Sequence, residues 1–315
     1  MAGDSRVRLQ PFFKYAGGKT WLREHMAPYM PKTLRMYVEP FVGGGAMLAH
    51  VLEMLDAGEM RLLEGGALYV NDVNAVLIEC YKQLRADAQA LFDTFQSLAT
   101  QHNIASQGER KALYLSVRAS YNEATTRRAP IDLIQCSRFL FLAYAGYRGL
   151  CRENKSGKYN TPAGEGKAIQ VTSGAFVAFG TALARYPVHF SAITAQQLMR
   201  TTIKPEDLGP DDIVLLDPPF EMAGGTGFVD YAHTSWSHID FIFLRVTCNA
   251  LRARGVRTFV CNNRVHRVVD LFERPSALWH TVVVKDQTGG MQAGRASRAE
   301  VVYCNVPPVQ CSTTQ

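Results

Sequence analysis

The segment from Asp211 to Phe220, DDIVLLDPPF, restricts the possible fold more than any other stretch of this chain. Four apolar residues in a row, 213–216, are typical of a short strand that is buried on both faces of a parallel sheet. Asp217 ends the run. The two prolines after it lack N–H groups and have a fixed φ, so the chain must leave the sheet in a stiff, extended turn. We therefore expect a carboxylate, rigid carbonyls and an aromatic ring at the carboxyl edge of a parallel sheet, where open α/β folds bind ligands.

The groups of this segment suit the recognition of an exocyclic amine on a planar base. The carboxylate of Asp217 and a carbonyl beside it can accept the two hydrogens of an –NH₂ group, and Phe220 offers a flat face to a ring. The alternative is a strand followed by an ordinary Pro-Pro turn, with the aspartate as a turn former. The segment alone leaves both interpretations open.

A second segment, MYVEPFVGGGA at 36–46, predicts a strand, a glycine turn and the start of a helix that extends to Met54. Three glycines let the backbone approach a ligand, and the helix N-terminus adds free N–H groups. The dinucleotide fingerprint needs a third glycine where Leu48 stands, so a pyrophosphate is not required. The turn is compatible with an adenosine-type cofactor.

A predicted strand at 67–71 ends in Asp72, and a helix is expected from Val73 to about Arg85. An acid in this place hydrogen-bonds ribose hydroxyls in Rossmann-like domains. The alternative is that Asp72 caps the helix. We favour the ribose role because the glycine turn lies one strand earlier.

The GGKT sequence that ends at Thr20 suggests a phosphate-binding P-loop and a nucleotide hydrolase. That motif needs a glycine where Phe13 stands, and no buried strand leads into it. The sequence therefore argues against this class.

Residues 86–145 show helical patterns at 88–101, 109–124 and 131–145 and no strand signal, so we predict an inserted domain. The loop-like stretch behind them, 144–162, combines glycines, aromatic residues and four basic residues. It suits phosphates and base edges, although a solvated basic loop has the same composition. The predicted organisation is a catalytic domain of residues 1–85 and 168–315 around a helical target-recognition domain of residues 86–167.

The remaining pattern predicts further α/β structure. It comprises a helix at 175–185, a strand at 188–190, a glycine-containing lid at 221–233, a helix capped by Ser235 that runs to Arg254, a strand at 258–261, a helix at 265–272, and a closing hairpin of 281–285 with 300–304.

Charge and cysteine content restrict the compartment and the partners. A net charge of +6 and a pI of about 8.9 are compatible with nucleic acid. No apolar run approaches the roughly 18 residues of a membrane helix, and the N-terminus has no signal-peptide core. Seven scattered cysteines without a C-x-x-C pair argue against a disulfide framework and a zinc site. We expect a cytoplasmic protein, nucleoid-associated if bacterial or phage, with neither a membrane nor a metal partner.

Taken together, these segments resemble the Dam-type DNA N6-adenine methyltransferases of the α group. The similarity runs from about Pro11 to Asn305, and it rests on FFKYAGGK, EPFVGGGAML, NDVN, DPPF, GYRGLCREN and GKYNTP, with the cofactor motif before the recognition domain and the catalytic motif last. Tyr15 stands where tryptophan is common and Phe220 where tyrosine is usual. In the DNA-reading part, Arg148, Tyr144 and Glu165 depart from the usual Asn, Arg and basic residue.

This resemblance implies a Rossmann-like α/β fold and S-adenosylmethionine as cofactor. The cofactor-binding residues would be Tyr15, Lys19, Glu39, Phe41, Gly43, Gly45, Asp72 and Asp217, and the catalytic residues Asp217, Pro218, Pro219 and Phe220. An adenine flipped out of double-stranded DNA would receive the methyl group, with no cysteine nucleophile.

The resemblance also implies a DNA-binding set: Lys14, Tyr147, Arg148, Leu150, Arg152, Asn154 and Pro162. Arg152 is the candidate for a bidentate contact to guanine, GATC is the first target to consider, and we expect a monomer. An RNA adenine or a cytosine N4 as acceptor remains an alternative, and so does a DNA-binding protein with a decayed site. A housekeeping, phage or restriction-modification role is equally open.

Overall fold

The computed structural model describes residues 8–12, 15, 17–220, 237–274, 278–287 and 298–308. The expected lid at 221–233, the expected cap Ser235 and Lys14 lie outside them. The chain divides into two compact units. Unit 1 comprises residues 1–20, 42–59 and 74–190, and unit 2 comprises residues 21–41, 60–73 and 191–315. The predicted insert of residues 86–167 lies within unit 1, and its status as a separate domain stays a prediction.

A seven-stranded sheet has the order β3-β2-β1-β4-β5-β7-β6. In unit 2 the neighbouring strands β2, β1, β4 and β5 are parallel, whereas β7 is antiparallel to both β5 and β6. The bounds are β1 Thr33–Glu39, β2 Arg61–Asn71, β3 Val188–Ser191, β4 Asp212–Leu216, β5 Arg257–Asn263, β6 His280–Gln287 and β7 Arg298–Cys304. The α/β class, the buried β4 strand and the closing hairpin are confirmed.

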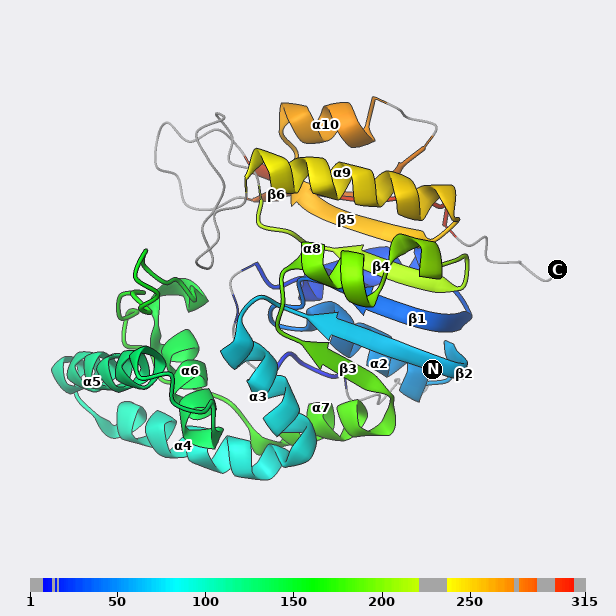
Figure 1. Cartoon of the computed structure of the whole chain (residues 1–315). Coiled ribbons are helices and arrows are strands. Elements are labelled where there is room, and N and C mark those ends of the chain that lie inside the picture. Colours follow the sequence, from blue (N-terminus) through cyan, green and yellow to red (C-terminus); the bar gives the residue numbers. More distant parts are fainter. Residues whose placement is uncertain are drawn as a thin grey trace. The chain divides into compact units, whose positions relative to one another are not determined.

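Helices α9 (His238–Ala253) and α10 (His266–Phe272) of unit 2 pack with a short segment, α8 (Ala195–Gln197) and the π-helical turn η4 (Leu198–Thr202), on one apolar core (Figure 1). Val38, Val214 and Val260 supply the sheet side of this core. Residues that alternate with them, such as Leu215 and Phe259, are buried as well. The central strands are therefore covered on both faces, which explains their near-continuous apolar sequence.

The rest of unit 2 consists of short helical pieces at its N-terminal end and before β4. They are η1 (Thr20–Leu22, whose first residue belongs to unit 1), α1 (Arg23–Met26), η2 (Ala27–Tyr29) and η5 (Pro205–Asp207). Residues 20–29 are thus a chain of single helical turns.

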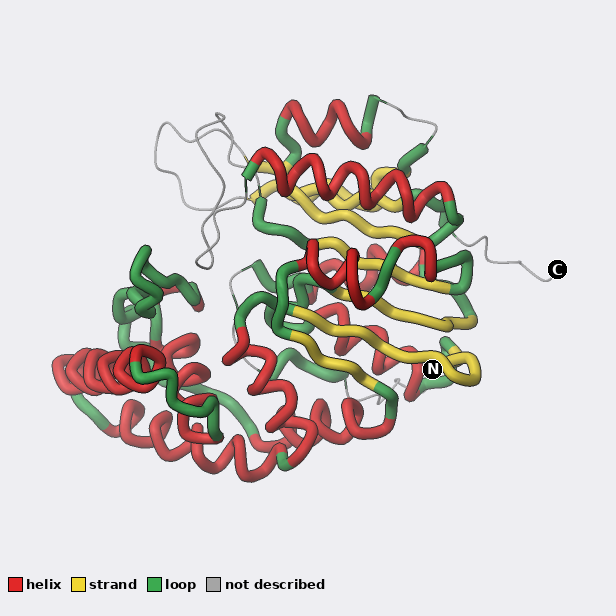
Figure 2. The backbone as a smooth tube through the Cα atoms, viewed as in Figure 1, coloured by secondary structure: helices red, strands yellow, loops and turns green. Residues whose placement is uncertain are grey.

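Unit 1 is mainly helical (Figure 2). Its helices are α2 (Ala46–Asp56), α3 (Ala75–Ala86), α4 (Ala88–Ile104), α5 (Gln107–Thr126), α6 (Leu133–Ala145) and α7 (Ser173–Arg185), with a 3-10 turn η3 (Tyr147–Gly149). Helix α6 contacts α3, α4 and α5, and α7 contacts α2, α3 and α4. Aromatic rings fill the interior: Phe12, Tyr81, Phe95, Phe176 and Phe179 are all buried. Each predicted helix of this region is present.

Three local expectations differ from the structure. β2 begins at Arg61 rather than at 67, because the Gly65-Gly66 pair lies within the strand, where its partner β1 shifts register between Leu34 and Met36. A Cβ atom on Gly66 would lie 2.6 Å from the carbonyl oxygen of Arg35, so glycine marks a close approach here and not a turn. The cap of α9 is Ser237, and the short α8 segment was not expected. None of the described helices is long and apolar enough to span a membrane.

Candidate active site

The carboxyl ends of three adjacent parallel strands bring three predicted site acids to one edge of unit 2. Glu39 ends β1, Asp72 follows β2, and Asp217 follows β4. The register pairs Glu39 with Val70 and Val38 with Val214, so the three strands end at similar heights. The chain continues from β1 to β2 on one side, and β4 lies on the other side. This reversal of strand order is the place where open α/β sheets bind ligands.

Glu39 is held in a buried position. Its side chain is 3% exposed, and its Oε2 accepts a hydrogen bond of 2.8 Å from the hydroxyl of Tyr37. A buried carboxylate needs such partners because desolvation penalises its charge. The carboxylate that is predicted to contact the cofactor is thus held in place by the Tyr37 hydroxyl.

Asn71, which the sequence did not single out, ties the end of β2 to its neighbours. Its Nδ2 donates to the carbonyls of Pro40 (3.0 Å) and Ile193 (2.9 Å), and its Oδ1 accepts from the hydroxyl of Ser191 (2.7 Å). The side chain is fully buried. A polar residue at the end of an apolar strand was the only sequence signal for this role.

Asp72 is not the helix cap. The side chain of Asn74 accepts from the backbone N–H of Leu77 at 3.0 Å and caps α3. The half-buried Asp72 has its own backbone N–H bonded to the carbonyl of Ser191 at 3.3 Å. The capping alternative is therefore wrong.

The acids at the two ends of β4, Asp212 and Asp217, have different surroundings. Asp212 is fully buried, forms an ion pair with Arg35, and accepts from the backbone N–H groups of Met36 (2.9 Å) and Gly209 (2.7 Å). These bonds set the start of β4 against β1. Asp217, at the other end, is half-buried, as are Pro219 and Phe220, while Pro218 is buried. The first acid is structural, and the second stands at the carboxyl edge of the sheet, where open α/β folds bind ligands.

The glycine turn belongs to unit 1 and leads into α2. Gly43 has φ +47° and Gly45 has φ +70°, values that favour glycine. The hydroxyl of Tyr81 donates to the carbonyl of Gly43 at 2.9 Å, and a Cβ atom on Gly45 would lie 2.3 Å from that same hydroxyl. A Cβ atom on Gly43 would lie 3.1 Å from the Tyr15 ring. Tyr15 and the turn are thus neighbours, as predicted. Tyr81 was missed because only the tertiary contact reveals it.

Lys19 lies in the N-terminal segment of unit 1, which is anchored by Phe12. The Phe12 ring is fully buried and lies 5.1 Å from the ring of Tyr81. Lys19 is 6% exposed, and its Nζ donates to the carbonyl of Gly17 at 2.8 Å. Residues 8–12 form no strand, which agrees with the argument against a P-loop.

Residues 146–163 form a hairpin, with antiparallel bridges between Gly146 and Ala163 and between Glu153 and Tyr159. At its tip, the side-chain oxygen of Asn154 accepts from the N–H groups of Ser156 and Lys158, both at 3.0 Å. Asn154 thus shapes the turn. The stretch that the sequence predicts as a loop is thus a hairpin.

The predicted DNA-binding residues of the hairpin differ in exposure. Tyr147, Arg148, Arg152 and Pro162 are exposed, whereas Leu150 and Asn154 are half-buried. Arg148 has φ +55°, uncommon for a residue other than glycine, and its guanidinium carbon lies 5.2 Å from the centroid of the Tyr147 ring. The Nε of Arg152 donates to the side-chain oxygen of Asn160 at 3.0 Å.

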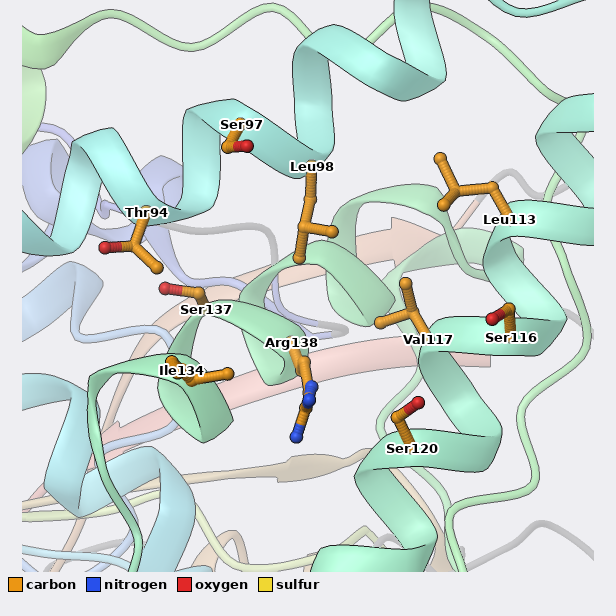
Figure 3. A pocket seen from close by; sticks show the side chains of 10 residues that line it. All are labelled: Thr94, Ser97, Leu98, Leu113, Ser116, Val117, Ser120, Ile134, Ser137 and Arg138. Carbon is orange, nitrogen blue, oxygen red and sulfur yellow. The ribbon is translucent and has the colours of Figure 1, made fainter.

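A cavity of about 400 Å³ lies elsewhere in unit 1, between α4, α5 and α6 (Figure 3). Hydroxyl and aliphatic groups line it, with Arg138 as the one charged side chain. No predicted site residue borders it, so it is separate from the candidate site. The described part of the chain holds no group of three His, Cys, Asp or Glu side chains that could bind a metal, and its six cysteines are buried.

Comparison with known proteins agrees with this geometry. Residues 15–288 match the family described as D12 class N6 adenine-specific DNA methyltransferase. A type II methyltransferase of Lactococcus lactis subsp. cremoris is 23% identical over 96% of this chain and 97% of its own length. A type II methyltransferase of Methanocaldococcus jannaschii is 26% identical over 82% of this chain and 85% of its own. A DNA adenine methylase of Vibrio cholerae is 26% identical, with 81% and 82% covered.

These matches decide between the alternatives that the sequence left open. The family description and the name of the Vibrio cholerae relative both give adenine in DNA as the methylated base, rather than cytosine or an RNA base. The reaction requires a methyl donor and DNA as the acceptor. The chain belongs to the D12 class of N6 adenine-specific DNA methyltransferases.

Proposed function

We propose that this enzyme uses S-adenosylmethionine to methylate N6 of an adenine that is flipped out of duplex DNA at a specific site. The observation that carries the proposal is the placement of Glu39, Asp72 and Asp217 at the ends of adjacent parallel strands, with Pro218 and Pro219 directly after the last acid. A duplex base must leave the stack before an enzyme can reach its amino group, which is why a flipped adenine is required.

The residues present fit S-adenosylmethionine. The first turn of α2 has no side-chain cap, because its N-cap is Gly45, so its N–H groups can face a carboxylate. Asp72 can accept from ribose hydroxyls, and the buried Glu39 can accept from an ammonium group. The proposed binding set is Tyr15, Lys19, Glu39, Phe41, Gly43, Gly45, Asp72 and Asp217.

When bound, the cofactor supplies an electrophilic methyl group. The chain's own contribution is placement and charge. The carboxylate of Asp217 and the carbonyl of Pro218 accept the two N6 hydrogens, which turns the nitrogen lone pair out of conjugation with the ring. The N6 lone pair would attack that methyl group to form the C–N bond, and the electron pair of the broken C–S bond would stay with sulfur. Asp217 is the acceptor placed to hold the proton that N6 loses.

Two features keep this geometry rigid. The prolines limit backbone freedom after Asp217, since each has a fixed φ. The whole of β4 before them is buried. Phe220 stacks on the adenine; it keeps the ring of the more usual tyrosine and lacks only the hydroxyl. We expect activity to survive that change.

Side chains of the 146–163 hairpin are proposed to contact DNA, together with Lys14. Arg152 has its Nε bonded to Asn160, which leaves the two terminal nitrogens for guanine O6 and N7. Tyr147, Arg148, Leu150, Asn154 and Pro162 complete the set. GATC is the first target to test, and a monomer is the expected state.

The decisive experiment measures transfer of labelled methyl from S-adenosylmethionine to a GATC duplex, a scrambled duplex and a structured RNA. Label in N6-methyladenine on GATC alone would support enzyme, cofactor and target together. Label on both duplexes would retain the reaction and reject GATC. Absence of label from both duplexes, with tight DNA binding, would overturn the proposal.

A further inference from the structure

Helix α5 directs three polar side chains at the 146–163 hairpin. Tyr114, Arg118 and Asn122 follow one another at intervals of four residues, so they lie on one face of the helix. All three end on the backbone of the second hairpin strand. The hydroxyl of Tyr114 and an Nη of Arg118 each donate to the carbonyl of Thr161 at 2.9 Å.

Asn122 makes the most specific of these contacts. Its Nδ2 donates to the carbonyl of Tyr159 at 3.0 Å, and its Oδ1 accepts from the N–H of the same residue at 2.7 Å. One side-chain amide thus occupies both hydrogen-bonding groups of one strand residue, as a neighbouring strand would. A one-residue slip of the hairpin would place other groups opposite both atoms.

The hairpin depends on this support. Between its two bridges it forms few backbone bonds, and an isolated two-stranded hairpin is marginally stable in water. The side chains of Tyr159 and Thr161 are buried against the unit, with 2% and 0% exposed. Burial raises the pKa of the Tyr114 hydroxyl well above its usual range, so this group remains a donor at neutral pH.

The two residues that α5 binds, Tyr159 and Thr161, flank the residue that holds Arg152. Asn160 lies between Tyr159 and Thr161, and its side-chain oxygen accepts from Nε of Arg152 at 3.0 Å. The N–H of Asn160 donates to the carbonyl of Arg152 at 2.9 Å, and the N–H of Arg152 donates to Oγ1 of Thr161 at 3.2 Å. Fixing the strand from α5 therefore fixes the direction of the guanidinium group.

We infer that Tyr114, Arg118 and Asn122 are positioning residues for base recognition: they hold the hairpin in the one register in which Arg152 presents its terminal nitrogens to a base edge. The inference rests on the proposed function of the hairpin. Bidentate recognition of a base needs two donors in a set orientation. A guanidinium group without a fixed orientation therefore loses discrimination between base pairs before the enzyme loses affinity for DNA. Arg152, the proposed base contact, is thereby held by three residues for which no DNA contact is proposed.

The test uses the full chain and the variants Asn122→Ala, Tyr114→Phe, Arg152→Ala and the double variant Asn122→Ala/Arg152→Ala. The wild-type target is first determined by sequencing a methylated random duplex pool. Methyl-transfer kcat/KM is then measured on that target and on every single-base variant. Tyr121→Phe is the matched control, since Tyr121 is a second buried tyrosine of α5 and its hydroxyl makes no bond to the described hairpin backbone.

We expect Asn122→Ala to lower discrimination by at least about fivefold at the same base pair that Arg152→Ala affects. Tyr114→Phe, which removes one bond and keeps the ring, should lower it less. The double variant should discriminate no worse at that pair than Arg152→Ala, because residues that act through one another are not additive. Cofactor affinity should be unchanged in all of them.

Other outcomes distinguish the positioning role of the α5 residues from the proposed function of the hairpin. If Arg152→Ala lowers discrimination while Asn122→Ala and Tyr114→Phe do not, the positioning role is wrong and the hairpin function stands. An equal loss of kcat/KM on every duplex in the α5 variants would show that these residues serve only the fold, and it would also overturn the inference. If Arg152→Ala leaves discrimination intact, the proposed base contact fails, and the inference fails with it.

Discussion

The hydroxyl group of Tyr81 on α3 donates a 2.9 Å hydrogen bond to the carbonyl oxygen of Gly43, 38 residues earlier in the chain. The Tyr81 ring is fully buried and stacks on Phe190 at 5.9 Å. A residue far from the glycine turn in sequence thus sets the conformation of the turn.

Tyr81→Phe should weaken S-adenosylmethionine binding roughly two- to tenfold, because a typical hydrogen bond contributes about 0.5–1.5 kcal/mol. The ring contacts remain, so the melting temperature should change little. Isothermal titration measures the affinity. Tyr186→Phe, which removes a hydroxyl bonded to Asp56, is the control; equal affinity loss in both variants would contradict a specific role for Tyr81.

Gly45→Ala should disrupt cofactor binding more than Gly58→Ala. Both glycines have positive φ, +70° and +67°, so both substitutions bear the same backbone cost of about 1–2 kcal/mol. Only at position 45 would the new Cβ atom meet another group, the Tyr81 hydroxyl at 2.3 Å, whereas nothing lies within 4 Å at position 58. Matched affinities of the two variants for S-adenosylmethionine would show that the close approach does not matter.

The two acids of the β4 segment should give opposite phenotypes. Asp217→Ala should lower methyl transfer at least about 100-fold while unfolding and DNA binding stay near wild type. Asp212→Ala should lower the free energy of unfolding by about 1–3 kcal/mol, because it leaves the half-buried N–H groups of Met36 and Gly209 without their acceptor. Urea unfolding and single-turnover transfer distinguish them. Normal turnover in Asp217→Ala would exclude the proposed chemistry.

Arg148→Asn should weaken DNA binding without loss of stability. Asparagine adopts positive φ more readily than arginine, so the backbone at φ +55° should tolerate the change or gain from it. Loss of a phosphate contact should reduce the slope of log affinity against log salt by about 1. Arg128→Asn is the matched control, since Arg128 has φ +51° and lies between α5 and α6 rather than in the hairpin. An equal effect of both changes would point to net charge alone.

The acid stability of unit 2 should depend on Glu273. Hydrogen bonds from Arg264, both 2.8 Å, lower the pKa of this carboxyl group below its ordinary value of 4.5, and the Tyr303 hydroxyl adds a bond of 2.6 Å. A lowered folded-state pKa means that the stabilisation is complete above the unfolded-state value and is lost as pH falls through the folded-state value.

Glu273→Gln should therefore destabilise the protein at pH 7 and have a smaller effect as the pH falls below 4.5. Urea unfolding of both proteins across this range measures the difference. A difference in the free energy of unfolding that stays constant down to pH 3 would show that the charge of Glu273 does not matter.

The sequence by itself determined the order and most bounds of the secondary structure. Buried strands show as apolar runs, and the prolines at positions 40 and 218 mark where β1 and β4 must end. Because parallel strands end at one edge, the meeting of Glu39, Asp72 and Asp217 could be predicted as well. These are local properties, set by periodicity and by backbone restrictions. The start of β2 could not be predicted in the same way, because glycines within a strand are also typical of turns.

Only the tertiary structure decided which side chains hold the site. Tyr81 and Gly43, Asp212 and Arg35, and Asn122 and Tyr159 are 38, 177 and 37 residues apart, and no local pattern links them. Periodicity shows which face of a helix is buried, but the partner depends on how the elements pack. Asp72 and Asn74 could each cap α3 by residue type, and only the structure shows that the cap is Asn74. Hydrogen bonds are directional, so these choices exist only once the packing has set their geometry.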